Sequence, residues 1–172
     1  MRASRTKPLC LALVAALPLL TAGCLFANQP VVWSQSGALD DSAGAKVSVE
    51  SRTMISPGEL EYMRHDITGR VRQVLRGKVD AADAYTVDVE ITRYDEGSKF
   101  ARFMLIGLGQ MYVFGTVEVT RGDPPVVVRT GDFRKQYRVG GIMGAIAGPR
   151  DITSTVGEAI ADGLMARPRG GS

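Results

Sequence analysis

Strict alternation of apolar and polar residues over residues 85–94 (YTVDVEITRY) constrains the fold of this chain more than any other feature. Val87, Val89 and Ile91 would lie on one face of a strand, and the polar residues between them on the other. The pattern therefore predicts a sheet with one covered and one solvated face. Such a sheet needs a second layer of structure over its apolar face.

Several further segments favour strands in the same sheet. We predict them at residues 46–53, 99–106, 110–120 and 126–139. Between the predicted strands at residues 85–94 and 99–106, the sequence DEGS (residues 95–98) indicates a hairpin turn in which Gly97 adopts a positive φ. Strands joined by such short turns predict an antiparallel meander.

Two amphipathic helices are expected to cover the sheet. The first begins at a capping box, in which Ser56 caps the helix, Pro57 occupies its first position and Glu59 returns a bond to the cap amide. We expect it to end at Gly77 in a left-handed stop. Its apolar stripe consists of Leu60, Met63, Ile67, Val71 and Val74. The second helix spans residues 151–165.

These elements predict an α+β fold. We expect a two-layer sandwich with a mostly antiparallel sheet, in the order β-α-β-β-β-β-α, and both helices on one face of the sheet. The single domain would span residues 46–167 and be followed by a disordered tail at 168–172. Residues 24–45 lack a sustained period and are predicted to form a tether, although the Val-Val-Trp run within them could dock on the domain.

The first 23 residues have the layout of a secretory signal peptide. Three basic residues precede an apolar run over residues 9–20, and small residues follow it. A bilayer span needs roughly 20 apolar residues, so this run is too short to cross a membrane. We expect residues 1–23 to be removed.

The sequence Thr21-Ala22-Gly23-Cys24 resembles the lipobox of bacterial lipoproteins. The resemblance implies cleavage between Gly23 and Cys24, a diacylglycerol on the Cys24 thiol and an acyl group on its new amino terminus. Thr21 departs from the pattern, which usually has Leu, Val or Ile there. The only other cysteine, Cys10, would leave with the signal peptide, so the mature chain has no internal disulfide.

The charge balance excludes a broad nucleic-acid-binding surface. The chain has 21 Lys and Arg against 18 Asp and Glu, and the signal peptide holds three of the basic residues and none of the acidic ones. The mature chain therefore carries 18 of each sign. A basic cluster on the first helix is interpreted as a solvated face; it consists of Arg64, Arg70, Arg72, Arg76 and Lys78.

Catalytic or metal-binding groups are not evident in the sequence. His65 is the only histidine, and both cysteines are removed or acylated, so we expect no metal site and no cofactor. A Gly-x-Ser-x-Gly elbow is missing, and adjacent Asp95 and Glu96 would point apart on a turn. The pair Gly107 and Gly109 lacks the context of a phosphate loop. We expect no enzymatic activity.

Residues 91–119 resemble a family of bacterial lipoproteins, the domain of unknown function 4410 family. The residues that carry the likeness are Tyr94, Gly97, Ser98, Arg102, Gly107 and Gly109. The resemblance implies an α+β domain in the cell envelope and no particular activity.

The preferred hypothesis is a lipid-anchored envelope protein with a non-catalytic binding or assembly role. Its membrane contact would be the covalent lipid, and its partner an envelope protein. Leu25 stands where an inner-membrane retention signal would place Asp, so we expect the outer membrane, facing the periplasm. The candidate partner-binding residues are Phe103, Met104, Leu105 and Ile106; the alternative is that these four belong to the core.

Two alternatives stay open at this point. A subunit of an outer-membrane pore or secretion complex would use residues 140–148 (GGIMGAIAG), a stretch too short to span a bilayer and more typical of a buried loop. A hydrolase would require Arg93, Asp95 and Arg102 to converge in one cleft.

Overall fold

A computed structural model of the protein describes residues 31–98, 110–137 and 149–166. The signal peptide, the predicted strand at residues 99–106, the glycine-rich stretch at 140–148 and the tail at 168–172 lie outside the described residues. None of the described helices is long and apolar enough to cross a membrane.

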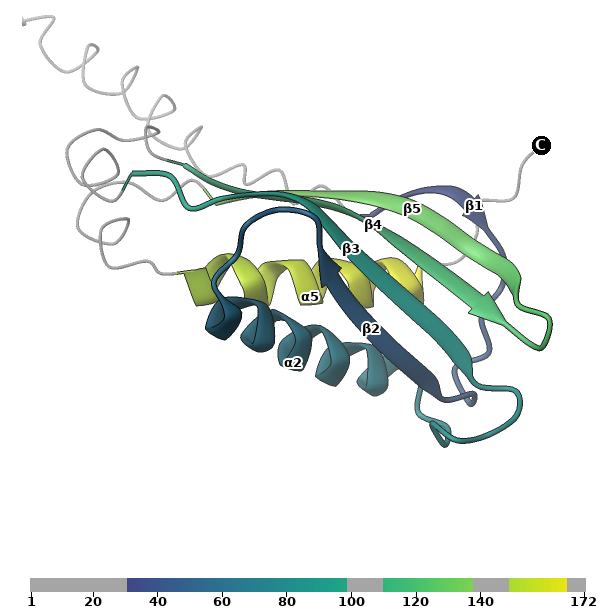
Figure 1. Cartoon of the computed structure of the whole chain (residues 1–172). Coiled ribbons are helices and arrows are strands. Elements are labelled where there is room, and N and C mark those ends of the chain that lie inside the picture. Colours follow the sequence, from purple (N-terminus) through teal and green to yellow (C-terminus); the bar gives the residue numbers. More distant parts are fainter. Residues whose placement is uncertain (1–30, 99–109, 138–148, 167–172) are drawn as a thin grey trace, which may run out of the picture.

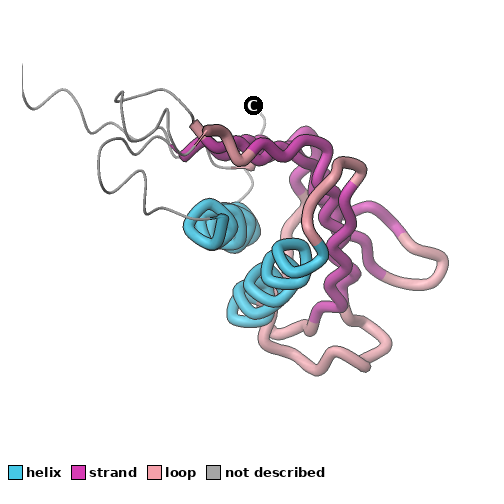
Figure 2. The backbone as a smooth tube through the Cα atoms, turned by 60° about the vertical axis from the view of Figure 1, so that its left-hand side comes forward, coloured by secondary structure: helices cyan, strands magenta, loops and turns pink. Residues whose placement is uncertain are grey.

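Five strands and two helices make up the described structure (Figure 1). The elements are β1 (Val32–Ser36), β2 (Ala45–Ser51), α2 (Pro57–Val74), β3 (Tyr85–Asp95), β4 (Met111–Arg121), β5 (Val126–Tyr137) and α5 (Pro149–Met165). The strands form one sheet in the order β1-β5-β4-β3-β2. Both helices lie on the same face of this sheet, and no described helix or strand covers the other face (Figures 1 and 2). The predicted two-layer α+β sandwich is confirmed.

Strand pairing is antiparallel except between β2 and β3. Parallel neighbours need a crossover connection, and α2 supplies it between these two strands. The predicted cap starts this helix, because the Ser56 hydroxyl accepts from the Glu59 amide at 3.3 Å. The Glu59 carboxylate accepts from the Ser56 hydroxyl at 2.7 Å and not, as predicted, from the Ser56 amide.

The predicted end of α2 at Gly77 is wrong. The helix ends at Val74, and Leu75 is already extended. Gly77 does not adopt a positive φ. Instead its backbone lies directly against residues 42–44, where an added Cβ would sit 2.4 Å from the Gly44 nitrogen. Glycine is needed here because two backbones meet, not because the helix stops in a left-handed turn.

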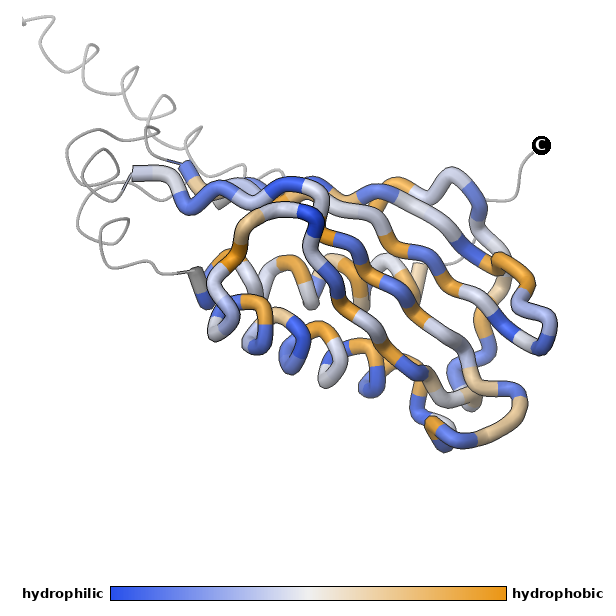
Figure 3. The backbone as a smooth tube through the Cα atoms, in the orientation of Figure 1, coloured by the Kyte–Doolittle hydropathy of each residue, from blue (hydrophilic) through white to orange (hydrophobic). Residues whose placement is uncertain are grey.

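The core lies between the sheet and the two helices. Val87, Val89 and Ile91 of β3 are buried on the predicted face. They meet Met63, Ile67 and Val71 of α2, which form the centre of the predicted stripe, and the buried side chains of α5, which are Ile152, Val156, Ile160 and Leu164. Figure 3 shows the alternation of hydropathy along the strands. Burying each such side chain stabilises the fold by about 1.5–3 kcal/mol.

Residues 32–36 are strand β1, so the prediction that residues 24–45 form only a tether needs correction. β1 pairs with β5 at the edge of the sheet, with a register shift between Trp33 and Gln35. Val31 is buried, and the Trp33 indole donates to the Gly163 carbonyl of α5 at 3.1 Å. The domain therefore begins before residue 46. Because β1 is short and its register is irregular, it has no clear period in the sequence.

Candidate interaction surface

Most of the residues that the sequence singled out lie outside the described residues. This holds for Gly23 and Cys24, for Arg102, Gly107 and Gly109, and for the proposed partner-binding segment that contains Phe103, Met104, Leu105 and Ile106. Their predicted roles stay predictions.

The described part of the family motif forms the end of β3 and its turn. Tyr94 pairs with Val113 of β4 and packs at the edge of the core. Burial is the main cause that raises the pKa of the Tyr94 hydroxyl, and the carboxylates of Glu59 and Glu96 add to it. Gly97 has the predicted positive φ, at 62°, and its amide donates to the Asp95 carboxylate at 2.8 Å. These residues shape a turn.

Arg93 and Asp95, two of the three residues of the hydrolase hypothesis, lie on the face of β3 away from the helices. The Arg93 guanidinium is over the Phe114 ring, and no ion pair joins it to Asp95 within the described ranges. Since Arg102 is not described, the hypothesis stays untested. His65 is exposed on α2. Among the residues that the structure places, no group of three His, Cys, Asp or Glu side chains converges as a metal site would require.

The uncovered face of the sheet carries a row of two arginines and a phenylalanine, which we call the arginine row. Arg93 of β3, Phe114 of β4 and Arg134 of β5 are direct cross-strand neighbours. The two guanidinium carbons lie 5.6 Å and 5.9 Å from the centre of the Phe114 ring. Both arginines are exposed, and each is held over one aromatic ring by cation–π attraction.

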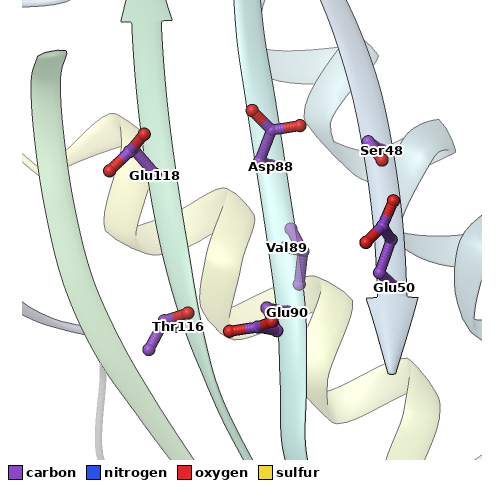
Figure 4. Close-up of a pocket in the computed structure, with 7 residues that line it drawn as sticks. All are labelled: Ser48, Glu50, Asp88, Val89, Glu90, Thr116 and Glu118. Carbon is purple, nitrogen blue, oxygen red and sulfur yellow. The ribbon is translucent and has the colours of Figure 1, made fainter. Parts of the chain in front are cut away.

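Next to the arginine row, the same face carries four carboxylates. Glu50, Asp88, Glu90 and Glu118 line a shallow depression of about 290 Å³ together with Ser48 and Thr116 (Figure 4). We call these four carboxylates the acidic patch. Their side chains project from β2, β3 and β4 on the face opposite α5, as Figure 4 shows. The patch is therefore a property of three paired strands and not of one segment.

Charges in the acidic patch repel one another. Burial raises the pKa of the Asp88 carboxyl, and the neighbouring Glu50 carboxylate raises it further. Glu90 forms an ion pair with Arg52. Glu50, Asp88 and Glu118 make no ion pair with any described residue, and the same is true of Arg93 and Arg134 in the arginine row. Glu90 is thus neutralised by Arg52, whereas the rest of the patch and both arginines of the row lack an ion pair among the described residues. Exposed Asp132, two residues from Arg134 on β5, adds a carboxylate beside the row.

Sequence reasoning missed the arginine row. Arg93 entered only as part of the hydrolase hypothesis, and Phe114 and Arg134 not at all. The alternation of the strands places Phe114 and Arg134 on outward positions. It would place Arg93 on the inward face with Val89 and Ile91, and only the register shift after Ile91 turns Arg93 outward. Their grouping depends on the register of β3, β4 and β5, including the register shift between Ile91 and Arg93.

A second cluster fixes the start of the described chain to the domain. Arg129 of β5 is only 2% exposed. It donates to the carbonyls of Gly37, Gly163 and Leu164 at 2.7, 3.0 and 3.0 Å. Its guanidinium carbon lies 5.5 Å from the centre of the Trp33 ring. Burial lowers the pKa of Arg129, yet the guanidinium stays a cation and donates hydrogen bonds to the carbonyls in the last turn of α5.

No known protein family matches the sequence, and a search of curated proteins gives no match. The fold does match solved structures. A dodecamer of a PelC variant from Paraburkholderia phytofirmans has a TM-score of 0.55 at 15% identity, covering 80% of this chain and 98% of that chain. A PelC dodecamer in another crystal form gives 0.54 at 14% identity, over 76% and 96%.

A candidate lipoprotein from Caulobacter crescentus gives a TM-score of 0.39 at 13% identity, over 72% of this chain and 88% of that chain, which is too low to support an argument. The two PelC matches are at low identity and concern the fold alone. The chain is therefore a two-layer α+β protein with the fold seen in PelC, and its uncovered sheet face carries the arginine row and the acidic patch.

Proposed function

We propose that this protein is a lipid-anchored subunit of the bacterial cell envelope, and that it has a structural role in which it assembles with copies of itself. The anchor is the lipid on Cys24, at the lipobox of residues 21–24. The lipobox supports a place in the cell envelope, and Leu25, which stands where a retention signal would place Asp, supports the outer membrane, facing the periplasm.

The observation that carries the assembly role is the likeness to PelC. The match extends over nearly the whole of that chain, and both matched structures are described as dodecamers. A closed assembly of this chain is also compatible with the alternative that the sequence left open, in which the protein is a subunit of an outer-membrane pore or secretion complex. No ion, substrate or catalytic step is required by this role.

The position of the anchor favours assembly close to the membrane. Cys24 and Val31 are seven residues apart, and seven residues span at most about 25 Å when fully extended. Val31 packs against α5, where it would be 3.1 Å from a Cβ added at Gly163. Because Arg129 and Trp33 hold this end of β1 to the domain, the lipid would keep the domain within that distance of the bilayer. Confinement to a surface raises the effective concentration of copies.

Native mass spectrometry of the full lipidated protein, extracted from membranes in mild detergent, tests the assembly role. We expect one dominant stoichiometry above the monomer, unchanged between two detergents of different micelle size. Crosslinking of lysines in intact cells before extraction should give a series of crosslinked oligomers of this chain, and the largest should have the number of copies found by mass spectrometry. A monomer in both experiments would refute the proposal.

The anchor is tested separately by replacing Cys24 with alanine. We expect Cys24→Ala to abolish labelling by radioactive palmitate and to leave an uncleaved or soluble product. Cys10→Ala is the matched control, because it removes the only other cysteine and lies in the signal peptide. It should be labelled like the unmodified protein. Labelled Cys24→Ala protein would contradict the lipobox interpretation.

A further inference from the structure

We propose that the uncovered sheet face is the interface between copies of this chain, with the arginine row of one copy docked on the acidic patch of the next. This inference rests on the proposed self-assembly and specifies the surface that performs it. The arginine row is Arg93, Phe114 and Arg134, and the acidic patch is Glu50, Asp88, Glu90 and Glu118.

Glu90 is the carboxylate of the patch nearest to the row, because it pairs with Thr116, two residues from Phe114, and its ion-pair partner is Arg52. The other carboxylates lie farther from the row. Phe114 and Glu118 are four residues apart on β4, which corresponds to about 13 Å along a strand. Consistent with this separation, no ion pair joins the row to the patch among the described residues. A second copy can bring opposite charges into contact where the chain itself does not.

Charge complementarity favours a second copy as the occupant. A foreign partner of one sign would neutralise only half of the face, whereas an identical face supplies both signs in the same geometry. The mature side chains carry 18 positive and 18 negative charges, so copies do not repel one another overall. Because the row and the patch lie on one face, two copies can pair face to face, each row on the other copy's patch, and such a twofold contact closes at two copies.

The chemistry of the arginine row suits a docked carboxylate. Stacking on Phe114 holds both guanidinium groups in place, so less side-chain freedom is lost when they bind. Phe114 is half-buried between them and offers an apolar centre to the contact. In the acidic patch of the other copy, the unpaired carboxylates of Asp88 and Glu118 would each gain a cation as partner.

Charge reversal with mixing tests the proposal on the full lipidated protein. The first variant, Arg93→Glu with Arg134→Glu, replaces both cations of the row by carboxylates, so that the row and the patch are both acidic. The second, Asp88→Arg with Glu118→Arg, leaves Glu50 and Glu90 in the patch and gives the row and the patch together a net positive charge. We expect each variant alone to raise the dissociation constant for self-association at least 10-fold. An equimolar mixture should return it to within about threefold of the original value, because each acidic face can then pair with a basic one.

The matched control reverses two arginines on the other side of the molecule. Arg64 and Arg72 are exposed on α2, so Arg64→Glu with Arg72→Glu changes the net charge by the same amount as the first variant. It should assemble like the original protein. Circular dichroism and the emission of Trp33, the chain's only tryptophan, verify that every variant folds.

The possible outcomes separate this proposal from the proposed function. If the original protein assembles and folded charge-reversed variants assemble equally well, the sheet face is not the interface, although self-assembly stands. If each variant fails alone and the mixture also fails, pairing between row and patch is refuted. If the original protein is monomeric, both proposals fall together.

Discussion

Replacing Arg129 by methionine should cost this domain a large part of its stability. Arg129 is buried at the point where β1, β5 and the end of α5 meet, and its side chain donates to three backbone carbonyls there. Methionine has a similar length but no donor. Arg129→Met therefore leaves the carbonyls of Gly37, Gly163 and Leu164 without this partner and removes the cation over Trp33.

The cost follows from the bonds that are lost. Each hydrogen bond from a charged donor is worth about 1.5 kcal/mol at the low end, so three contribute about 4.5 kcal/mol. The cation–π contact with Trp33 adds about 1 kcal/mol. Relief from burying a charge, together with water reaching the carbonyls at the helix end, offsets about 2–3 kcal/mol. We expect a net loss of about 3 kcal/mol in the free energy of unfolding.

Trp33 reports on this site directly because the chain has no other tryptophan. In urea unfolding followed by Trp33 emission, Arg129→Met should lower the midpoint without changing the slope. In thermal unfolding, 3 kcal/mol corresponds to a decrease of about 10 °C in a domain of this size. The native emission of the variant should also shift to longer wavelength as β1 loosens.

Arg52→Met is the matched control for this prediction. Arg52 is an exposed arginine whose ion pair with Glu90 lies at the surface, so its replacement should change the free energy of unfolding by less than about 1 kcal/mol. If Arg129→Met is as stable as Arg52→Met, apolar packing compensates for the lost donors. The conclusion that Arg129 holds β1 to α5 would then be wrong.

Two further substitutions test other parts of the structure. Gly115→Ala should lower the free energy of unfolding by more than about 2 kcal/mol, because the added Cβ would sit 2.3 Å from the Glu90 carbonyl oxygen. The control is Gly69→Ala at an open helical position, which should not destabilise the domain. Equal urea midpoints for the two variants would contradict this prediction. Asp88→Asn should raise stability at pH 7, where the Asp88 carboxylate is charged beside Glu50, and the gain should vanish in acid. The sign follows from the raised pKa: the folded state holds the proton more tightly, so stability falls as pH rises from about 3.8 through the folded-state pKa. An unfolding free energy that is equal for the two proteins from pH 3 to pH 8 would refute it.

The elements that the sequence predicts well are those whose signal is local. The helix cap at Ser56, the stripe on α2 and the alternation of β3 each depend on neighbours within a few residues along the chain. Periods of 3.6 and 2 residues follow from backbone geometry, so they are visible before any tertiary contact is known. The fold class follows from these periods, because each apolar face must be covered.

The features that only the tertiary structure decides depend on contacts between distant segments. Strand β1 is stabilised by Trp33 and by Arg129, which lies more than 90 residues away. Gly77 is required by the approach of residues 42–44 and not by its own helix. The arginine row exists because β3, β4 and β5 pair in one register, and a shift of one residue would turn its side chains to the other face. Register and backbone approach are set by the packing of the whole core, so a single segment of sequence carries no signal for them.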